Sequence, residues 1–169
     1  MITVKDLTIT KRNGKIYQKT IERDEGKMVV ESKRQGKTCC FYISEFHLEM
    51  ILVPYINKII GENITILTQK KLKETVEILI SKINIKPENK EKILKLNWNG
   101  ENEIKENSNI IIIGSKEYIK RKNKEILDKN PISIIDCYDF EEEKDNMNII
   151  IKQYNNVLNS LGKKKFENF

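Results

Sequence analysis

Ile110-Ile-Ile-Ile-Gly114 is a short, continuous apolar run, and Pro131-Ile-Ser-Ile-Ile-Asp-Cys-Tyr138 is a second, mostly apolar stretch of the kind found in buried strands. Runs of this kind are typical of strands that are buried on both faces of a sheet. Between them, residues 115–129 have the pattern of a helix, and a further helix is expected from Asp139 to Leu161, before a frayed basic tail. The order strand, helix, strand, helix predicts a parallel βαβα unit over residues 110–169.

Before this unit, the apolar residues have helical spacing. Leu48, Ile51, Leu52, Tyr55, Ile56 and Ile59 fall on one face of a helix, with Ser44 as its N-cap. Pro54 lies inside the pattern and is expected to kink or split this helix. Two further helices are expected after Thr68 and from Glu88 to Leu96. The polar stretch 97–109 then predicts a linker, so that the chain divides into 1–96, 97–109 and 110–169.

The first 43 residues have the pattern of strands. Four segments, 4–10, 15–21, 27–32 and 37–43, are separated by turns at 11–14, 23–26 and 33–36. Asn13-Gly14 is the strongest short hairpin signal in the chain. Four strands joined by short turns predict an antiparallel meander. The expected fold class is therefore α+β: a four-stranded N-terminal meander, central helices and a C-terminal βαβα unit.

Composition limits the class of protein. The chain has 169 residues and no alanine, and 31 Lys and Arg against 25 Asp and Glu give a net charge of +6. Only four of the basic residues are arginines, so codon bias toward lysine explains part of the excess. No apolar stretch approaches the ~20 residues of a membrane span, and the first residues lack the apolar core of a signal peptide. Three cysteines form no complete disulfide framework. We therefore expect a cytoplasmic protein.

A candidate nucleic-acid site lies in the predicted meander. Basic residues flank its turns, and Tyr17 alternates with two lysines along one strand. Basic and aromatic side chains on one sheet hold single-stranded nucleic acid by charge attraction and base stacking. The structural alternative is that basic turn residues only keep the sheet edges soluble. The candidate residues are Lys11, Arg12, Lys15, Tyr17, Lys19, Lys33, Arg34 and Lys37.

A second candidate site follows the two buried strands, where the carboxyl ends of parallel strands commonly bind ligands. It comprises Gly114, Ser115, Lys116, Asp136 and Asp139. The alternative is that Ser115 and Asp139 are ordinary helix caps. His47 is the only histidine, and Cys39 and Cys40 should point to opposite faces of a strand. We therefore predict no catalytic residue, no metal site and no cofactor.

Three hypotheses about function follow. The first is a nucleic-acid-associated binding or regulatory protein. The second is a protein–protein inhibitor or adaptor of phage or mobile-element type, which would expose apolar residues of the Pro54 helix as a partner surface. The third is a nucleotide- or metal-binding enzyme that uses the 114–116 and 136–139 loops. Because general acid–base groups are scarce, we favour a binding protein over an enzyme. The oligomeric state is not predicted.

Overall fold

The computed structural model describes residues 4–12, 15–24, 27–33 and 36–166, with side chains described from Gly36 onward. The chain divides into two compact units, Met1–Lys37 and Thr38–Phe169. The predicted linker, residues 97–109, lies inside the second unit, between the helix Pro87–Lys95 and the strand Asn109–Ile113. Trp98 is fully buried there and donates its indole N–H to the Ile93 carbonyl at 2.9 Å.

The first unit is a three-stranded antiparallel sheet in the order β1-β2-β3. Its strands are β1 (Val4–Arg12), β2 (Lys15–Asp24) and β3 (Lys27–Lys33). Arg12 lies opposite Lys15 between β1 and β2, and Gln18 lies opposite Lys33 between β2 and β3. The tips of the predicted turns, at 13–14, 25–26 and 34–35, lie outside the described residues.

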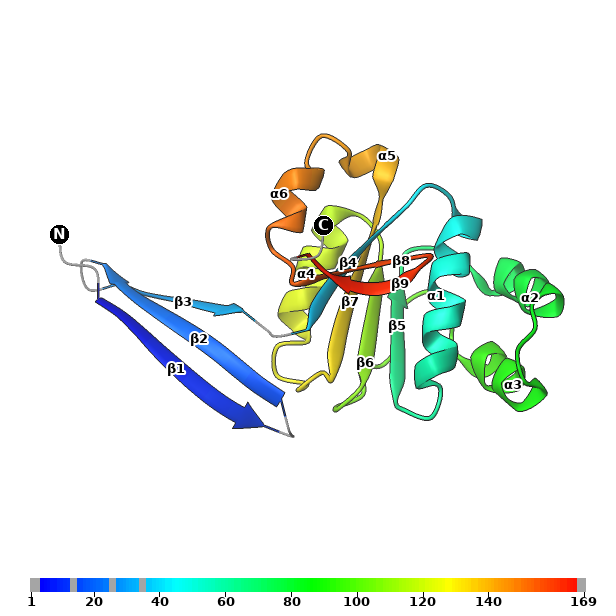
Figure 1. Cartoon of the computed structure of the whole chain (residues 1–169), viewed down its shortest axis with the longest axis horizontal. Coiled ribbons are helices and arrows are strands. Elements are labelled where there is room, and N and C mark those ends of the chain that lie inside the picture. The colour runs from blue at the N-terminus through cyan, green and yellow to red at the C-terminus, as the bar shows by residue number, and fades with distance from the viewer. Residues whose placement is uncertain (1–3, 13–14, 25–26, 34–35, 167–169) are drawn as a thin grey trace. The chain divides into compact units, whose positions relative to one another are not determined.

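The second unit contains a six-stranded sheet in the order β5-β6-β7-β4-β8-β9 (Figure 1). The pairs β5–β6, β6–β7 and β4–β8 are parallel, and the hairpin β8–β9 is antiparallel. The strands are β4 (Lys37–Tyr42), β5 (Ile64–Thr68), β6 (Asn109–Ile113), β7 (Ser133–Asp139), β8 (Asn156–Asn159) and β9 (Gly162–Lys165).

Helices pack on both faces of this sheet. They are α1 (Glu45–Ile59), α2 (Lys73–Lys82), α3 (Pro87–Lys95), α4 (Lys116–Glu125), α5 (Phe140–Glu143) and α6 (Met147–Ile151). Ile111 and Ile113 belong to the core shared with α1, α2 and α3. Ile110 and Ile112 belong to the opposite core, shared with α4 and α6. The alternation along β6 thus supplies both cores, as expected for a strand with two buried faces.

The predicted central helices form, with local differences. Ser44 caps α1 by accepting the backbone N–H of His47 at 3.1 Å. Pro54 does not split α1, which continues through it to Ile59. The strand β5 differs from the expectation, because the sequence pattern predicts only helices between residues 44 and 96.

The prediction of a four-stranded N-terminal meander is wrong. The segment expected as its fourth strand, β4, lies between β7 and β8 in the six-stranded sheet and runs parallel to β8. The reason is its sequence: Thr38, Cys39, Cys40 and Tyr42 are all buried. Such a strand needs a cover on both faces, which an exposed meander does not supply. As the alternation predicts, Cys39 and Cys40 enter opposite cores.

The prediction of a two-strand βαβα unit that ends in one long helix is also wrong. Its two strands are part of the larger sheet, and the residues after Ile151 form the β8–β9 hairpin. The turn of this hairpin is stabilised by Asn159, whose side-chain oxygen accepts the Leu161 N–H at 2.9 Å. Gly162 has a φ of 105°, a conformation that favours glycine and does not fit a helix. The α+β class is confirmed, but its architecture is a mixed six-stranded sheet.

Candidate nucleic-acid interface

The positive charge of the chain is concentrated in the first unit. Residues 1–37 contain ten Lys and Arg against five Asp and Glu, a net charge of +5. The remaining residues, 38–169, contain 21 basic and 20 acidic residues, a net charge of +1. Three of the four arginines, Arg12, Arg23 and Arg34, also lie in the first unit. The positive electrostatic potential that would attract a polyanion is therefore expected around the first unit.

The register of the three strands separates the basic residues between its two faces. Residues opposite each other in an antiparallel pair share a face, and residues along one strand alternate. Arg12 lies opposite Lys15, so its position shares a face with Lys15, Tyr17, Lys19 and Arg23 of β2. Asp6 is the one acidic position on this face of the described strands. We call this side of the sheet the basic face.

The other side, which we call the mixed face, has a different charge pattern. Lys11 lies opposite Ile16 and Lys33 opposite Gln18, so both share the mixed face. Its charged positions in the described strands are Lys5, Lys11, Glu22, Asp24, Lys27, Glu31 and Lys33. The predicted basic surface is thus divided between the two faces. Arg12, Lys15, Tyr17 and Lys19 share the basic face, whereas Lys11 and Lys33 belong to the mixed face.

The last two residues of the predicted surface, Arg34 and Lys37, are not part of β1, β2 or β3. Arg34 lies outside the described residues. Lys37 begins β4 and is partly buried. Neither residue therefore has a described position on either face of the three-stranded sheet.

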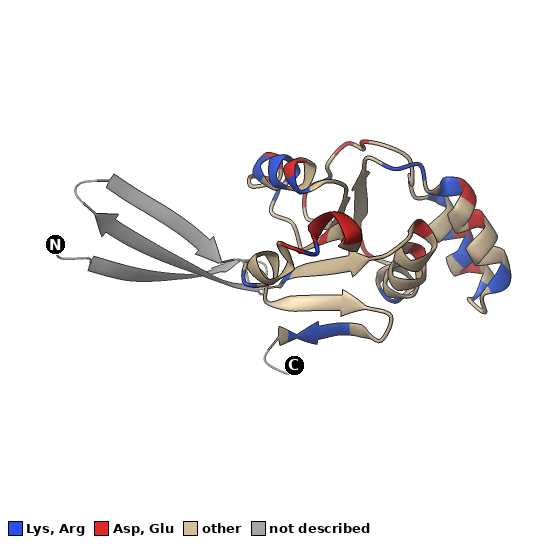
Figure 2. Cartoon of the chain, turned by 90° about the horizontal axis from the view of Figure 1, so that it is seen from above, with Lys and Arg blue, Asp and Glu red and all other residues tan. Residues whose placement is uncertain are grey.

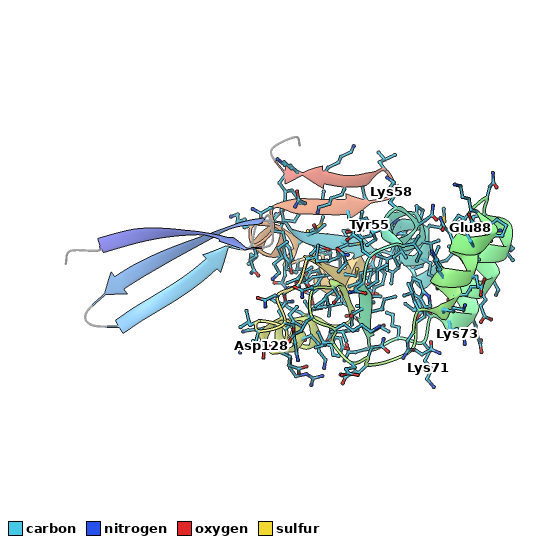
Figure 3. The ribbon with its side chains drawn as sticks, turned by 90° about the horizontal axis from the view of Figure 1, so that it is seen from below. Tyr55, Lys58, Lys71, Lys73, Glu88 and Asp128 are labelled. Atoms are coloured by element: carbon cyan, nitrogen blue, oxygen red, sulfur yellow. The ribbon has the colours of Figure 1, made fainter. Side chains whose placement is uncertain are left out.

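Several basic residues of the second unit lie close to acids. On α4, which carries several cations (Figure 2), Lys122 contacts Glu101 at 3.1 Å and Glu125 at 2.8 Å. Arg121 lies 3.7 Å from the same Glu101. Lys71, just before α2, and Lys73, its first residue, point outward (Figure 3), and Glu74 follows in the first turn. This mixture agrees with the small net charge of the unit.

At the second candidate site, the residues after β6 have structural roles. Ser115 caps α4 by accepting the Tyr118 N–H, and its own N–H donates to Oε1 of Gln69 at 2.8 Å. A Cβ added at Gly114 would lie 2.5 Å from that same Gln69 oxygen and 2.6 Å from the Tyr118 ring. The Gln69 side chain therefore already satisfies one backbone N–H at the start of α4, and the absence of a side chain at Gly114 leaves room for it. Lys116 is half-buried at the start of this helix.

The two aspartates are not brought together as ligands. Asp139 caps α5 by accepting the Glu141 N–H at 2.9 Å. Asp136 is fully buried in the middle of β7, opposite Ile112, rather than at the strand end. Its carboxylate accepts from Nδ2 of Asn123 at 3.0 Å for each oxygen, and from the Tyr154 hydroxyl at 2.5 Å.

Two buried tyrosines complete the network around Asp136. Tyr154 donates its only hydroxyl hydrogen to the carboxylate, so Tyr138 is the donor in the 2.5 Å contact between the two hydroxyls. Burial and the Asp136 charge raise the pKa of both tyrosines. Both hydroxyls therefore stay protonated as donors. The arrangement satisfies a buried carboxylate and has the features of a structural network.

Sequence reasoning missed one group at the carboxyl edge. Lys70, after β5, lies 5.7 Å above the Tyr42 ring and 3.5 Å from the carboxylate of Glu45. Burial raises the Tyr42 pKa, and the nearby ionisable groups Cys137, Asp139 and Glu142 add to this increase. Tyr42 belongs to the segment 37–43, which was expected as the fourth strand of the meander. Only the strand order, which puts β4 beside β7, brings it to this edge.

The described residues hold no group of three His, Cys, Asp or Glu side chains arranged to bind a metal. No helix in the same residues combines the length and apolar character that a membrane crossing requires. No protein family, no curated protein and no solved structure matches this chain.

Proposed function

We propose that this chain is a nucleic-acid-associated regulatory protein that binds single-stranded nucleic acid on the basic face of its first unit. The observation that carries the proposal is the register of β1, β2 and β3. It gives Arg12, Lys15, Lys19 and Arg23 a common face with one acidic position, Asp6. Codon bias toward lysine would add basic residues to both units alike. The excess of basic over acidic residues instead belongs almost entirely to the first unit.

The chemistry of the basic face favours a single strand over a duplex. Tyr17 lies between Lys15 and Lys19 on alternate positions of β2. Such an arrangement offers an aromatic ring to an unstacked base and cations to the phosphates on either side. Arg12 adds a guanidinium, which binds phosphate through two parallel hydrogen bonds. In a duplex the bases are stacked on one another, so only the charge attraction would remain.

Fluorescence anisotropy of the full chain with labelled oligo-dT, oligo-U and a matched duplex, at low and physiological salt, tests the proposal. We expect binding to both single strands that persists at physiological salt and exceeds duplex binding. In the double variant Lys15→Gln/Lys19→Gln, the slope of log affinity against log salt should fall by about 1.4, since each phosphate contact contributes ~0.7. Tyr17→Ala should weaken binding by about 1–3 kcal/mol.

The matched control is Lys11→Gln/Lys33→Gln, which removes the same charge from the mixed face. Its affinity should change much less than that of Lys15→Gln/Lys19→Gln. Equal losses in the two double variants would mean that net charge alone attracts the ligand, and would contradict a site on one face. Binding that vanishes at physiological salt without preference for any form would contradict the function itself.

A second candidate function, docking of a partner protein, is favoured by one observation in the second unit. Ile43 precedes the cap of α1, and Phe46 and Met50 lie in its first two turns; the three residues are 66%, 51% and 47% exposed. Exposed apolar clusters of this kind are common at protein interfaces. If the first unit binds no nucleic acid, this cluster is where an adaptor function would be tested, with Phe46→Ser as the variant that should abolish partner binding.

A further inference from the structure

The first unit has a feature that its proposed ligand does not explain. In the described residues, this unit consists of one layer, with β1 and β3 as the two edges of the sheet. Domains are normally built from packed layers, and an edge strand presents a row of unpaired backbone N–H and carbonyl groups. With nine residues, β1 is the longer of these edges.

We propose that two copies of this chain pair edge to edge through β1, antiparallel, with Ile9 of each copy at the two-fold axis. In this register Leu7 lies opposite Lys11, Thr8 opposite Thr10, and Asp6 opposite Arg12. The two sheets then form one continuous six-stranded sheet. A two-fold axis normal to the sheet turns the same face of both copies to the same side.

Charge complementarity selects this register. Within one chain, Arg12 lies opposite Lys15, a like-charge pair that destabilises the sheet, whereas Asp6 lies opposite the apolar Ile21. Pairing through Ile9 places an acid opposite each Arg12 and a base opposite each Asp6, twice per dimer. Pairing through Thr8 instead would place Lys5 opposite Lys11 twice and is disfavoured.

The other edge is a weaker candidate. A pairing of two β3 strands through Val29 would also match Lys27 with Glu31. However, β3 is shorter, and its carboxyl end continues within a few residues into β4, which belongs to the second unit. The pairing through β1 uses no residue of β2, and it does not rest on the proposed nucleic-acid function.

Disulfide trapping of the full chain, without nucleic acid, tests the register. In the proposed dimer the Cα atoms of the two Ile9 residues are about 4.5–5.5 Å apart, which is within disulfide range. Ile9→Cys should therefore give a covalent dimer on mild oxidation. Thr8→Cys, Thr10→Cys and Val29→Cys serve as matched controls and should stay largely monomeric on a non-reducing gel. The native cysteines Cys39, Cys40 and Cys137 are fully buried and give a low background.

Sedimentation of charge variants provides a second measurement that needs no cysteine. Asp6→Arg turns both ion pairs into repulsive pairs and should raise the dimer dissociation constant about tenfold or more. The exchange Asp6→Arg/Arg12→Asp should restore dimerisation, which a variant that merely unfolds the sheet would not do.

Three results would overturn the proposal. The first is a monomeric wild-type chain at concentrations where Ile9→Cys also fails to form a covalent dimer. The second is trapping by Thr8→Cys, Thr10→Cys or Val29→Cys in preference to Ile9→Cys, which would assign a different register or edge. The third is an exchange variant that sediments no differently from Asp6→Arg. Loss of nucleic-acid binding with the dimer intact would instead contradict only the proposed function.

Discussion

The two units of this chain differ in what holds them together and in what charge they carry. The second unit has helices on both faces of a sheet, two apolar cores and almost no net charge. The first has a single three-stranded layer and nearly all of the net positive charge of the chain. A charged sheet gains little from burial, so its stability depends more on what binds to it. The comparison supports our proposal that the second unit is a scaffold and the first a binding element.

The largest expected effect tests whether the second unit is such a scaffold. Trp98 is fully buried in the core shared with α1, α2 and α3, and its indole N–H is satisfied by the Ile93 carbonyl. Trp98→Ala should destabilise the second unit by about 3–5 kcal/mol, because a large cavity replaces the ring. The measurement is urea denaturation followed by far-ultraviolet circular dichroism.

Trp98→Phe is the matched control, since it keeps most of the ring volume and loses the hydrogen bond. It should cost clearly less than Trp98→Ala. At temperatures where Trp98→Ala stays folded, its affinity for single-stranded nucleic acid should equal that of the wild type. A parallel loss of affinity would show that the two units do not act separately and would break the comparison.

A smaller effect is expected from the buried carboxylate of Asp136. Asp136→Ala would leave the Tyr154 hydroxyl and the Asn123 amide without their acceptor in a buried site. Each unsatisfied buried group costs about 1–3 kcal/mol. We therefore expect a lower unfolding midpoint in a thermal melt, together with unchanged nucleic-acid binding at low temperature.

The isosteric change Asp136→Asn sharpens this result. It keeps an acceptor for Tyr154 but removes the charge and sets an amide N–H₂ against Asn123. The unfolding midpoint of Asp136→Asn should lie between those of the wild type and Asp136→Ala. If instead Asp136→Asn destabilises no more than a surface substitution and yet abolishes binding of a nucleotide, Asp136 is a ligand residue, and the function belongs to the second unit.

How much of this fold could be predicted from the sequence depends on how local the signal is. Strands β6 and β7 were found because mostly apolar stretches, four isoleucines in a row in β6, suit a doubly buried strand. Helix α1 was found because its spacing and its Ser44 cap are local. Strand β4 was placed in the wrong sheet, because its neighbours in space, β7 and β8, are nearly a hundred residues or more away in sequence.

The site residues follow the same rule. The common face of Lys15, Tyr17 and Lys19 could be predicted, because alternation along one strand is local. The separation of Lys11 and Lys33 from them could not, since it depends on the register between strands. Likewise, Asp136 was predicted as a ligand residue at the carboxyl end of its strand. Its structural partners could not be predicted, because Asn123 and Tyr154 lie 13 and 18 residues away on other parts of the chain.

The smallest effect concerns a buried acid in the scaffold, Glu49 of α1. The Thr75 hydroxyl lies in hydrogen-bond contact with Oε1 of Glu49 and also 3.0 Å from the Leu72 carbonyl. A hydroxyl has one hydrogen, so when Thr75 donates to Leu72, Glu49 must itself be protonated to complete the contact. Burial, which outweighs the opposing Thr75 contact, and the nearby negative charge of Glu45 raise the Glu49 pKa above its ordinary value. Glu45 is in turn paired with Lys70.

A raised carboxyl pKa stabilises the folded state below the ordinary value of the group, and this stability is lost as pH rises through the folded value. Glu49→Gln keeps a donor to Thr75 at every pH, so its stability advantage over the wild type should grow from about pH 4.5 upward and then level off. The measurement is the free energy of unfolding of both proteins at a series of pH values. A difference that stays constant with pH would mean that Glu49 ionises normally in the fold. Nucleic-acid binding by the first unit should be the same in both proteins at each pH, because the titrating group belongs to the scaffold alone.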